Sequence, residues 1–237
     1  MIYAEILAGG HGKRFGNKDL PKQFMMLSEK PIIIHTIEQF VINKDIDKII
    51  VCTPKNWISY TEDLIKKYIK NNDNIEVTCG GSTRNESIIN GCKYIEKTYG
   101  INKDDIIVTH DAVRPFINQR IIEDNIKAGK KCSAVDTVIP ATDTIIKSLD
   151  NKEIESIPNR SVLYYGQTPQ TFNILELMEL YTSLTEEEKD ILTDACKIFV
   201  LKNKPVKIVM GETFNIKITT VFDLKLASAI VTVRNDA

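Results

Sequence analysis

The sequence predicts an α/β protein: a mostly parallel, twisted sheet with helices on both faces and a protruding β-hairpin arm. Short apolar runs alternate with helical patterns along most of the chain, and a polar hairpin pattern interrupts them once. Such alternation is typical of parallel sheets, because parallel neighbours are joined by crossover helices. With no internal repeat or linker, we expect one domain over residues 1–237, with the arm at residues 142–165.

The expected elements follow in a regular order. Strands are expected where β-branched and other apolar residues form short runs, at Ile2–Leu7, Ile49–Thr53, Ile75–Thr78, Ile106–Thr109, Ala134–Ile139 and Val206–Met210. Helices are expected where apolar residues recur every three to four positions, at Pro31–Val41, Ile58–Lys70, Arg84–Tyr99, Gln119–Lys131, Ile174–Leu184, Glu186–Lys202 and Val221–Val233. Thr185 precedes a run of glutamates in the manner of a capping box.

The arm is expected where Asp143–Ser148 and Ile154–Ile157 flank a polar turn at Leu149–Lys152. A hairpin outside the sheet has little core of its own, so it usually packs against something. We therefore expect the arm to be a contact of a homodimer. A hairpin exposed to solvent is the alternative.

Composition excludes several functional classes. The chain of 237 residues is 43% hydrophobic, which is enough for a substantial core. Its net charge of −1 argues against a general binder of nucleic acids or membrane surfaces. The five cysteines show no metal spacing, no apolar run is long enough to span a membrane, and a strand begins the sequence in place of a signal peptide. These features predict a cytoplasmic protein with reduced thiols.

A glycine-rich turn follows the first strand and is typical of a polyphosphate site. Gly9, Gly10 and Gly12 let backbone N–H groups approach phosphate oxygens, and Arg14 and Lys22 offset the anionic charge. The turn matches neither common glycine motif. A Walker A loop would need glycine at position 7, and the dinucleotide motif begun at Gly10 would need it at position 15. A tight strand-to-helix connection is the alternative interpretation.

Two further segments follow expected strands and should lie at the same edge of the sheet. Gly80-Gly81 leads into a helix, where Arg84 can reach a phosphate and Ser87 a base; Ser82 or Thr83 can equally be a helix cap. Asp111 ends another strand, where a carboxylate can hold a ribose hydroxyl or Mg²⁺, or simply belong to a turn. Ligands of such sheets bind at the carboxyl ends of the strands.

Together the segments resemble the nucleotidyltransferases that join a sugar or polyol phosphate to a nucleotide. Within them the chain is similar to the cytidylyltransferases that act on methylerythritol 4-phosphate and ribitol 5-phosphate. The patterns are L-A-G-G-x-G-x-R-x-G with P-K-Q, G-G-x-x-R-x-x-S, the D-A-V-R that begins at Asp111, Arg160 followed by T-P-Q-x-F, and N-I-K-I-T. The resemblance implies a Rossmann-like nucleotidyltransferase fold and transfer of CMP from CTP, with Mg²⁺ as cofactor.

The resemblance also implies the roles of individual residues. Arg14 and Lys22 stabilise the triphosphate, while Arg160 and Lys217 hold the incoming phosphate. Residues implied to bind CTP are Leu7, Ala8, Gly9, Gly10, Gly12, Gly80, Gly81, Arg84, Asn85, Ser87, Asp111 and Ala112, with Asp111 also a metal contact. Arg114, Thr144 and Thr168 are implied to bind the acceptor, and we expect Arg114 and Thr144 to reach the site of a neighbouring subunit through the arm. Lys217 lies between Ile216 and Ile218 in an alternating, strand-like pattern, so it should face a polar pocket.

Three details favour ribitol 5-phosphate as the acceptor: Gly9 in L-A-G-G, Tyr165-Gly166-Gln167 before the T-P-Q pattern, and Thr193–Lys197. On this interpretation the product is CDP-ribitol for teichoic-acid or capsule synthesis, and a reductase that makes ribitol 5-phosphate is the pathway partner. Methylerythritol 4-phosphate, for isoprenoid precursors, is the alternative acceptor. Glu5, His11 and Lys13 depart from the family pattern and leave room for another pentitol or glycerol phosphate of a capsule pathway. A non-catalytic nucleotide-binding protein and a uridylyl- or guanylyl-transferring relative are less favoured.

Overall fold

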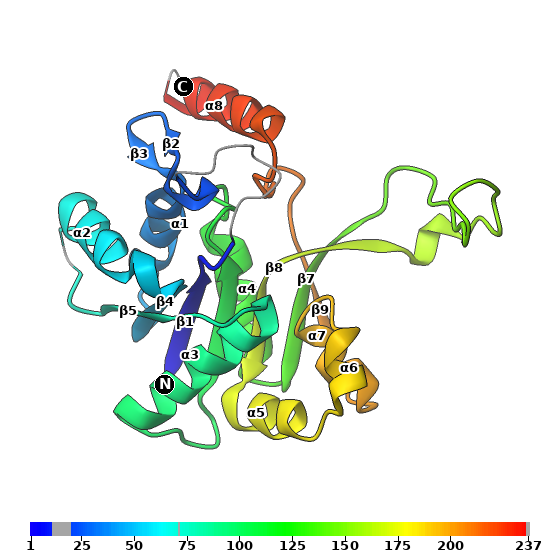
Figure 1. Ribbon diagram of the computed structural model, residues 1–237, viewed down its shortest axis with the longest axis horizontal. Coiled ribbons are helices and arrows are strands. Elements are labelled where there is room, and N and C mark those ends of the chain that lie inside the picture. The colour runs from blue at the N-terminus through cyan, green and yellow to red at the C-terminus, as the bar shows by residue number, and fades with distance from the viewer. Residues whose placement is uncertain (11–19, 71, 236–237) are drawn as a thin grey trace.

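A computed structural model describes residues 1–10, 20–70 and 72–235. A seven-stranded sheet with the order β5-β4-β1-β6-β8-β7-β9 forms the centre of the described part (Figure 1). The strands are β1 (Ile2–Leu7), β4 (Lys48–Thr53), β5 (Ile75–Cys79), β6 (Ile106–Asp111), β7 (Ala134–Pro140), β8 (Tyr164–Asn173) and β9 (Lys207–Met210). Two short strands, β2 (Met26–Leu27) and β3 (Lys30–Pro31), form a separate antiparallel pair.

The large sheet is mostly parallel, as predicted. In the part of the chain that the structure describes, β8 alone runs against its neighbours, pairing antiparallel with β6 and with β7. The register of β1 places Leu7 opposite both Cys52 of β4 and Asp111 of β6, so the carboxyl ends of three strands meet.

Strand β8, which contains the T-P-Q pattern, was not predicted from the sequence. Proline has no N–H for a strand ladder, which makes it a poor sign of a central strand. The structure accommodates Pro169 at an irregularity in the pairing of β7 with β8, where the register shifts between Asp136 and Val138.

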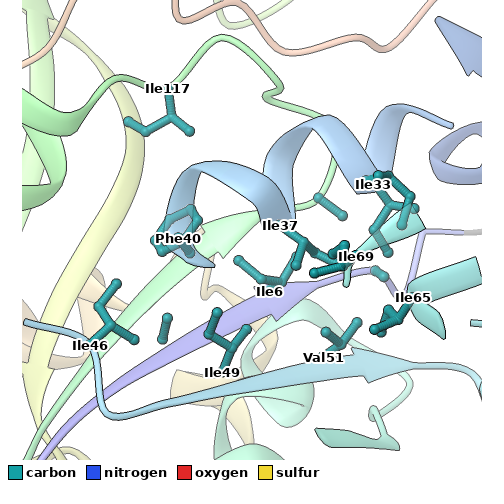
Figure 2. Close-up of a cluster of buried hydrophobic side chains, with 14 of the residues drawn as sticks. Ile6, Ile33, Ile37, Phe40, Ile46, Ile49, Val51, Ile65, Ile69 and Ile117 are labelled. Atoms are coloured by element: carbon teal, nitrogen blue, oxygen red, sulfur yellow. The ribbon is translucent and has the colours of Figure 1, made fainter. Parts of the chain in front are cut away.

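Helices cover both faces of the sheet. On one face, α1 (Ile32–Val41), α2 (Ile58–Tyr68) and α4 (Gln119–Gly129) pack on a core that includes Ile6, Ile37 and Phe40 (Figure 2). On the other face, α3 (Arg84–Tyr99), α5 (Ile174–Thr182) and α7 (Cys196–Leu201) pack on a second core. Alternate residues of β1 therefore enter opposite cores, as the period of a strand requires.

The single helix expected at Glu186–Lys202 is two helices, α6 (Glu186–Asp190) and α7. The capping box at the start of α6 is confirmed by reciprocal bonds between Thr185 and Glu188. Asp194 explains the break, because its carboxylate accepts a bond from the backbone N–H of Lys197 and so begins a new helix.

The last helix, α8 (Val221–Asn235), packs through Leu224, Ala227 and Ile230 against a third, smaller core near β2 and β3. Phe222 lies on its outer surface and is 74% exposed. Within residues 1–10, 20–70 and 72–235, no helix has the length and apolar character needed to cross a membrane.

The arm leaves the sheet between β7 and β8 and extends away from the body of the molecule (Figure 1). A backbone bond from Ala141 N to Leu163 O closes its base, at 3.0 Å. The hairpin expected farther out is reduced to one antiparallel bridge, between Lys147 and Ser156. Its exposed apolar side chains are Ile146, Leu149, Ile154, Ile157 and Val162. Apolar side chains gathered on a projecting segment are typical of a surface that meets a partner.

Glu5 has an ionisable side chain that is fully buried. It lies on β1, facing α3, with no exposed surface, and one of its carboxylate oxygens accepts a bond from Cys52 Sγ at 2.9 Å. Among the described residues the other oxygen, Oε2, has no partner. Helix α3 comes so close that a Cβ on Gly91 would collide with Glu5. Burial raises the pKa of Glu5 to about 8.

A Glu5→Gln variant should be more stable than the parent protein at pH 8 and similar to it at pH 5. The folded protein keeps Glu5 neutral up to about pH 8, whereas in the unfolded chain the pKa of this carboxyl is near its ordinary value of 4.5. The parent therefore loses a few kcal/mol of stability as pH rises between these values, and the glutamine variant does not. Urea unfolding at pH 5, 6, 7 and 8 measures this; an equal pH dependence in both proteins would contradict it.

Candidate active site

The carboxyl ends of β1 and β6 and the turn that follows β5 border a cleft with a volume of about 290 Å³. Backbone and side chains from three separate turns form most of its wall, so segments far apart in the sequence meet as expected. The lining residues are Leu7, Ala8, Gly9, Gly10, Lys22, Gln23, Gly81, Ser82, Thr83, Arg84, Ser87, Asp111, Val113 and Lys217.

The first turn is fixed from two sides. Ala8 N donates to Cys52 O at 2.8 Å, and the buried amide of Gln23 donates to Ala8 O at 2.6 Å. Lys22 lies beside Gly10 in the cleft. Gly12 and Arg14 lie outside the described residues. Sequence reasoning assigned no role to Gln23, although its place directly after Lys22 in P-K-Q was a signal.

The second turn holds its glycines against the start of α3. Ser87 Oγ accepts a bond from Gly81 N at 3.0 Å and donates to Thr83 O at 2.8 Å. Thr83 is also the cap of α3, because its side chain accepts from Glu86 N. The helix-cap interpretation and the binding interpretation are therefore compatible for this segment. Gly80 and Asn85 stand behind the lining, and Asn85 is buried.

A Gly81→Ala variant should weaken nucleotide binding. An added Cβ would come within 2.8 Å of the backbone carbon of Glu86, so the turn must move away from α3. We expect an increase in KM for the nucleotide of about 10-fold, the size of effect that a displaced set of binding groups produces. Gly166→Ala is the matched control, since its Cβ would have nothing closer than 4.0 Å. Equal kinetics of the two variants would contradict this role of the turn.

Asp111 is the centre of the charges in the cleft. Its carboxylate lies 2.9 Å from Lys217 Nζ, 3.3 Å from Arg84 Nε and 3.4 Å from Arg114 Nε. Burial opposes its ionisation, but these three cations more than offset that effect and hold the pKa of Asp111 well below its usual range. The cleft therefore has an excess of positive charge in a protein of net charge −1.

Lys217 faces the cleft, as the alternation predicted, while Ile218 is fully buried. The strand assumed for that alternation is absent from residues 211–220, where the backbone is irregular. The segment is instead fastened by side chains: Asn215 Nδ2 donates to Thr168 O at 2.8 Å, and Gln167 Nε2 donates to Glu212 O at 2.9 Å.

Arg114 does not lie on the arm, so the expectation that it reaches a neighbouring subunit by that route is wrong. Its side chain is 11% exposed and is held within its own subunit by Asp111 and by a bond from Nη1 to Asn215 O at 2.8 Å. Ala112, the residue after Asp111, is buried behind the cleft and donates its N–H to Leu7 O.

Thr168 lies behind Asp111 and supports it. Its Oγ1 accepts a bond from Asp111 N at 3.2 Å and lies 2.9 Å from His110 Nδ1. Burial lowers the pKa of His110 to about 3, so this ring is neutral at neutral pH. The threonine hydroxyl then donates to Nδ1, and Nε2 donates to Arg114 O at 3.1 Å.

Arg160 and Thr144 lie on the arm and are absent from the described cleft lining. Both are exposed, and Arg160 Nη1 donates to Thr142 O at 2.6 Å. The expected grouping of Arg160 with Lys217 is therefore not found in the cleft of one subunit.

The resemblance implies a bound Mg²⁺ ion, so the side chains of the cleft can be compared with the ligands that such an ion needs. Among the residues that the structure describes, no group of three or more His, Cys, Asp and Glu side chains could hold a metal ion. Asp111 supplies a carboxylate to the cleft lining. Both oxygens of that carboxylate are already paired with cations, so an Mg²⁺ ion here would take most of its ligands from water and substrate phosphates.

Known proteins resemble the chain over nearly its full length. A protein-family model described as IspD, 2-C-methyl-D-erythritol 4-phosphate cytidylyltransferase, matches residues 2–233. The 4-diphosphocytidyl-2C-methyl-D-erythritolsynthase from Anaerococcus prevotii DSM 20548 is 28% identical, with 98% of this chain and 96% of that chain covered and a TM-score of 0.80. The 2-C-methyl-D-erythritol 4-phosphate cytidylyltransferase from Francisella tularensis is 28% identical, with 96% and 98% covered and a TM-score of 0.76. The Thermus thermophilus enzyme of that name, at 21% identity, 96% and 98% coverage and a TM-score of 0.71, shows the same fold.

Proposed function

The chain belongs to the 2-C-methyl-D-erythritol 4-phosphate cytidylyltransferase family and is a nucleotidyltransferase that uses CTP, and we propose which reaction its cleft catalyses and which acceptor it uses. The cleft transfers CMP from CTP to the phosphate of a small polyol phosphate. The observation that supports this most is the ring of cations around Asp111 at the carboxyl edge of the sheet. Two polyanions must meet in this reaction, and fixed cations favour their meeting.

The chemistry needs positive charge more than it needs a base. The second pKa of a phosphomonoester is near 6, so the acceptor is already largely a dianion at neutral pH. Its oxygen forms a bond to the α-phosphorus of CTP, the bond from that phosphorus to the β-phosphate oxygen breaks, and pyrophosphate leaves. Lys22 stabilises the triphosphate, and Lys217 holds the incoming phosphate near Asp111. Mg²⁺, when bound to the triphosphate, neutralises part of its charge.

We propose 2-C-methyl-D-erythritol 4-phosphate as the acceptor, because the family description and the names of the similar structures favour it over ribitol 5-phosphate. Ribitol 5-phosphate stays the second candidate on the three sequence details: Gly9, Tyr165-Gly166-Gln167 and Thr193–Lys197. With that acceptor, a reductase that makes ribitol 5-phosphate is the expected pathway partner.

Pyrophosphate release with CTP and Mg²⁺ tests both acceptors in parallel. Turnover with methylerythritol 4-phosphate alone supports the first candidate, and turnover with ribitol 5-phosphate alone replaces it with the second. UTP, ATP and GTP serve as nucleotide controls. No pyrophosphate with CTP and either acceptor would overturn the proposed function.

We propose further that the protein acts as a homodimer, in which the arm of one subunit brings Arg160 and Thr144 to the cleft of the other. The support is that both side chains lie on a projecting arm, are exposed and are separate from the cleft of their own subunit. The apolar side chains of the arm would be covered in such a dimer.

Co-expression of Arg160→Ala and Lys217→Ala subunits should restore activity that neither variant has alone. In a mixed dimer, the Arg160→Ala subunit keeps its own Lys217 and receives Arg160 from its partner, so one of the two sites is complete. Random pairing of two-fold dimers predicts about one quarter of the parent activity. Absence of any restoration in purified mixed dimers would mean that Arg160 acts within its own subunit or not at all.

A further inference from the structure

Gln170 connects the cleft to the interior of the sheet. It lies on β8 and is 2% exposed. Its Oε1 accepts a bond from Arg84 Nη1 at 3.0 Å, and its Nε2 donates to Asp136 Oδ1 at 3.0 Å. Gln170 does not line the cleft, so its effect on a ligand must pass through Arg84.

Asp136 and Arg84 favour the same orientation of the Gln170 amide. A side-chain amide has an acceptor oxygen at one end and a donor nitrogen at the other. An ionised carboxylate can only accept, so Asp136 selects the nitrogen and leaves the oxygen for the guanidinium. In the reversed orientation the amide nitrogen would face the guanidinium of Arg84, and donors would lie against donors. The bond to Asp136 therefore also stabilises the bond between Gln170 and Arg84.

Arg84 is held from two sides and keeps one group unpaired. Gln170 binds Nη1, and Asp111 lies 3.3 Å from Nε. The third nitrogen, Nη2, is buried and has no hydrogen-bond partner among the described residues. The side chain is 23% exposed and lines the cleft, so its positive charge acts on a bound anion.

We infer that Asp136 and Gln170 are positioning residues for Arg84, holding its guanidinium at the wall of the cleft, where it binds an anionic oxygen of the nucleotide. This inference rests on the proposed function, because the nucleotide of that reaction is the ligand. It extends the site from the cleft wall across β8 to β7. Sequence reasoning placed Gln170 in the T-P-Q pattern without a role and did not single out Asp136.

The test combines an apolar replacement with a conservative one. Gln170→Met keeps the size of the side chain but removes its bonds to Arg84 and Asp136 and a weaker one to Cys196 Sγ. It should raise KM for CTP and the Kd of CTP by about 10- to 100-fold, the usual cost of lost bonds to charged groups. KM for the acceptor should change by less than about 3-fold, since nothing that binds it is removed. Asp136→Leu should resemble Gln170→Met, whereas Asp136→Asn keeps an acceptor oxygen and should resemble the parent protein.

Gln119→Met is the matched control, because Gln119 bonds to Asn43 and Gln39 on the opposite face of the sheet. Melting temperatures establish that each variant folds. A parent-like Kd for CTP in folded Gln170→Met, or an Asp136→Asn variant as weak as Asp136→Leu, would overturn the inference. Because calorimetric titration with CTP needs no acceptor, it separates this failure from failure of the proposed transfer reaction, which the pyrophosphate assay reports.

Discussion

Replacing Lys22 with alanine should lower kcat for pyrophosphate release by about 100- to 1,000-fold, the effect of removing one group that stabilises charge in a transition state. Lys22 lines the cleft beside Gly10 and begins a short 3-10 helix, Lys22–Phe24. The leaving group gains negative charge as the bond to the α-phosphorus breaks, so the ammonium group acts most strongly there. Single-turnover kinetics with saturating CTP measure this step without product release.

Lys97→Ala is the control for this prediction. Lys97 is exposed on α3, so its removal changes the net charge equally without touching the cleft. Lys22→Arg separates charge from shape, because it keeps a cation in a different geometry. If Lys22→Ala only raised KM and left kcat unchanged, Lys22 would bind substrate and transition state equally.

The second large effect is on stability: Asp111→Asn should destabilise the protein without nucleotide by about 3 kcal/mol or more, the usual cost of breaking a buried ion pair. Asp111 is the counter-ion of Arg84, Arg114 and Lys217, and its side chain is 8% exposed. Removing the carboxylate leaves these cations close together and uncompensated. Urea unfolding at pH 7 measures the loss.

The pH dependence of that loss follows from the lowered pKa of Asp111. The carboxylate contributes its stability above the ordinary pKa of aspartate, 3.8, and loses it as pH falls through the lower folded value. The difference between the two proteins should therefore be constant from pH 5 to 7 and shrink in more acidic solution. Asp124→Asn, at an exposed pair with Arg120, should change stability by less than about 1 kcal/mol. An equal loss of stability in Asp111→Asn and Asp124→Asn would show that the buried cluster around Asp111 stabilises the protein no more than an exposed ion pair does.

The sequence predicts this fold well where a local pattern decides burial. The apolar run at Ile2–Leu7 and the helical spacing along Ile32–Val41 are such patterns, and the cores confirm both elements. The prediction of strands failed where contacts between distant segments decide the structure. Strand β8 was missed because it contains Pro169. The proline is accommodated by an irregularity in the pairing of β8 with β7, which the local sequence does not reveal.

The candidate site divides in the same way. The glycine turns and Lys22 were visible because their spacing in the sequence carries the chemistry. The bonds of Asp111 to Arg84 and Lys217 join residues 27 and 106 positions apart, which no local pattern reveals. The separation of Arg160 from Lys217 depends on the direction in which the arm projects, and alternating polarity does not encode that direction.

The hydrogen bond that closes the base of the arm affects how easily the arm can change in length or sequence among related proteins. Ala141 and Leu163 are hydrogen-bonded neighbours, so everything between them is an insertion whose ends already meet. A segment of this kind can lengthen, shorten or be exchanged at little entropic cost to the sheet that carries it. Grafting residues 142–162 from a relative should therefore leave the sheet and the cleft lining intact while changing the side chains that the arm presents.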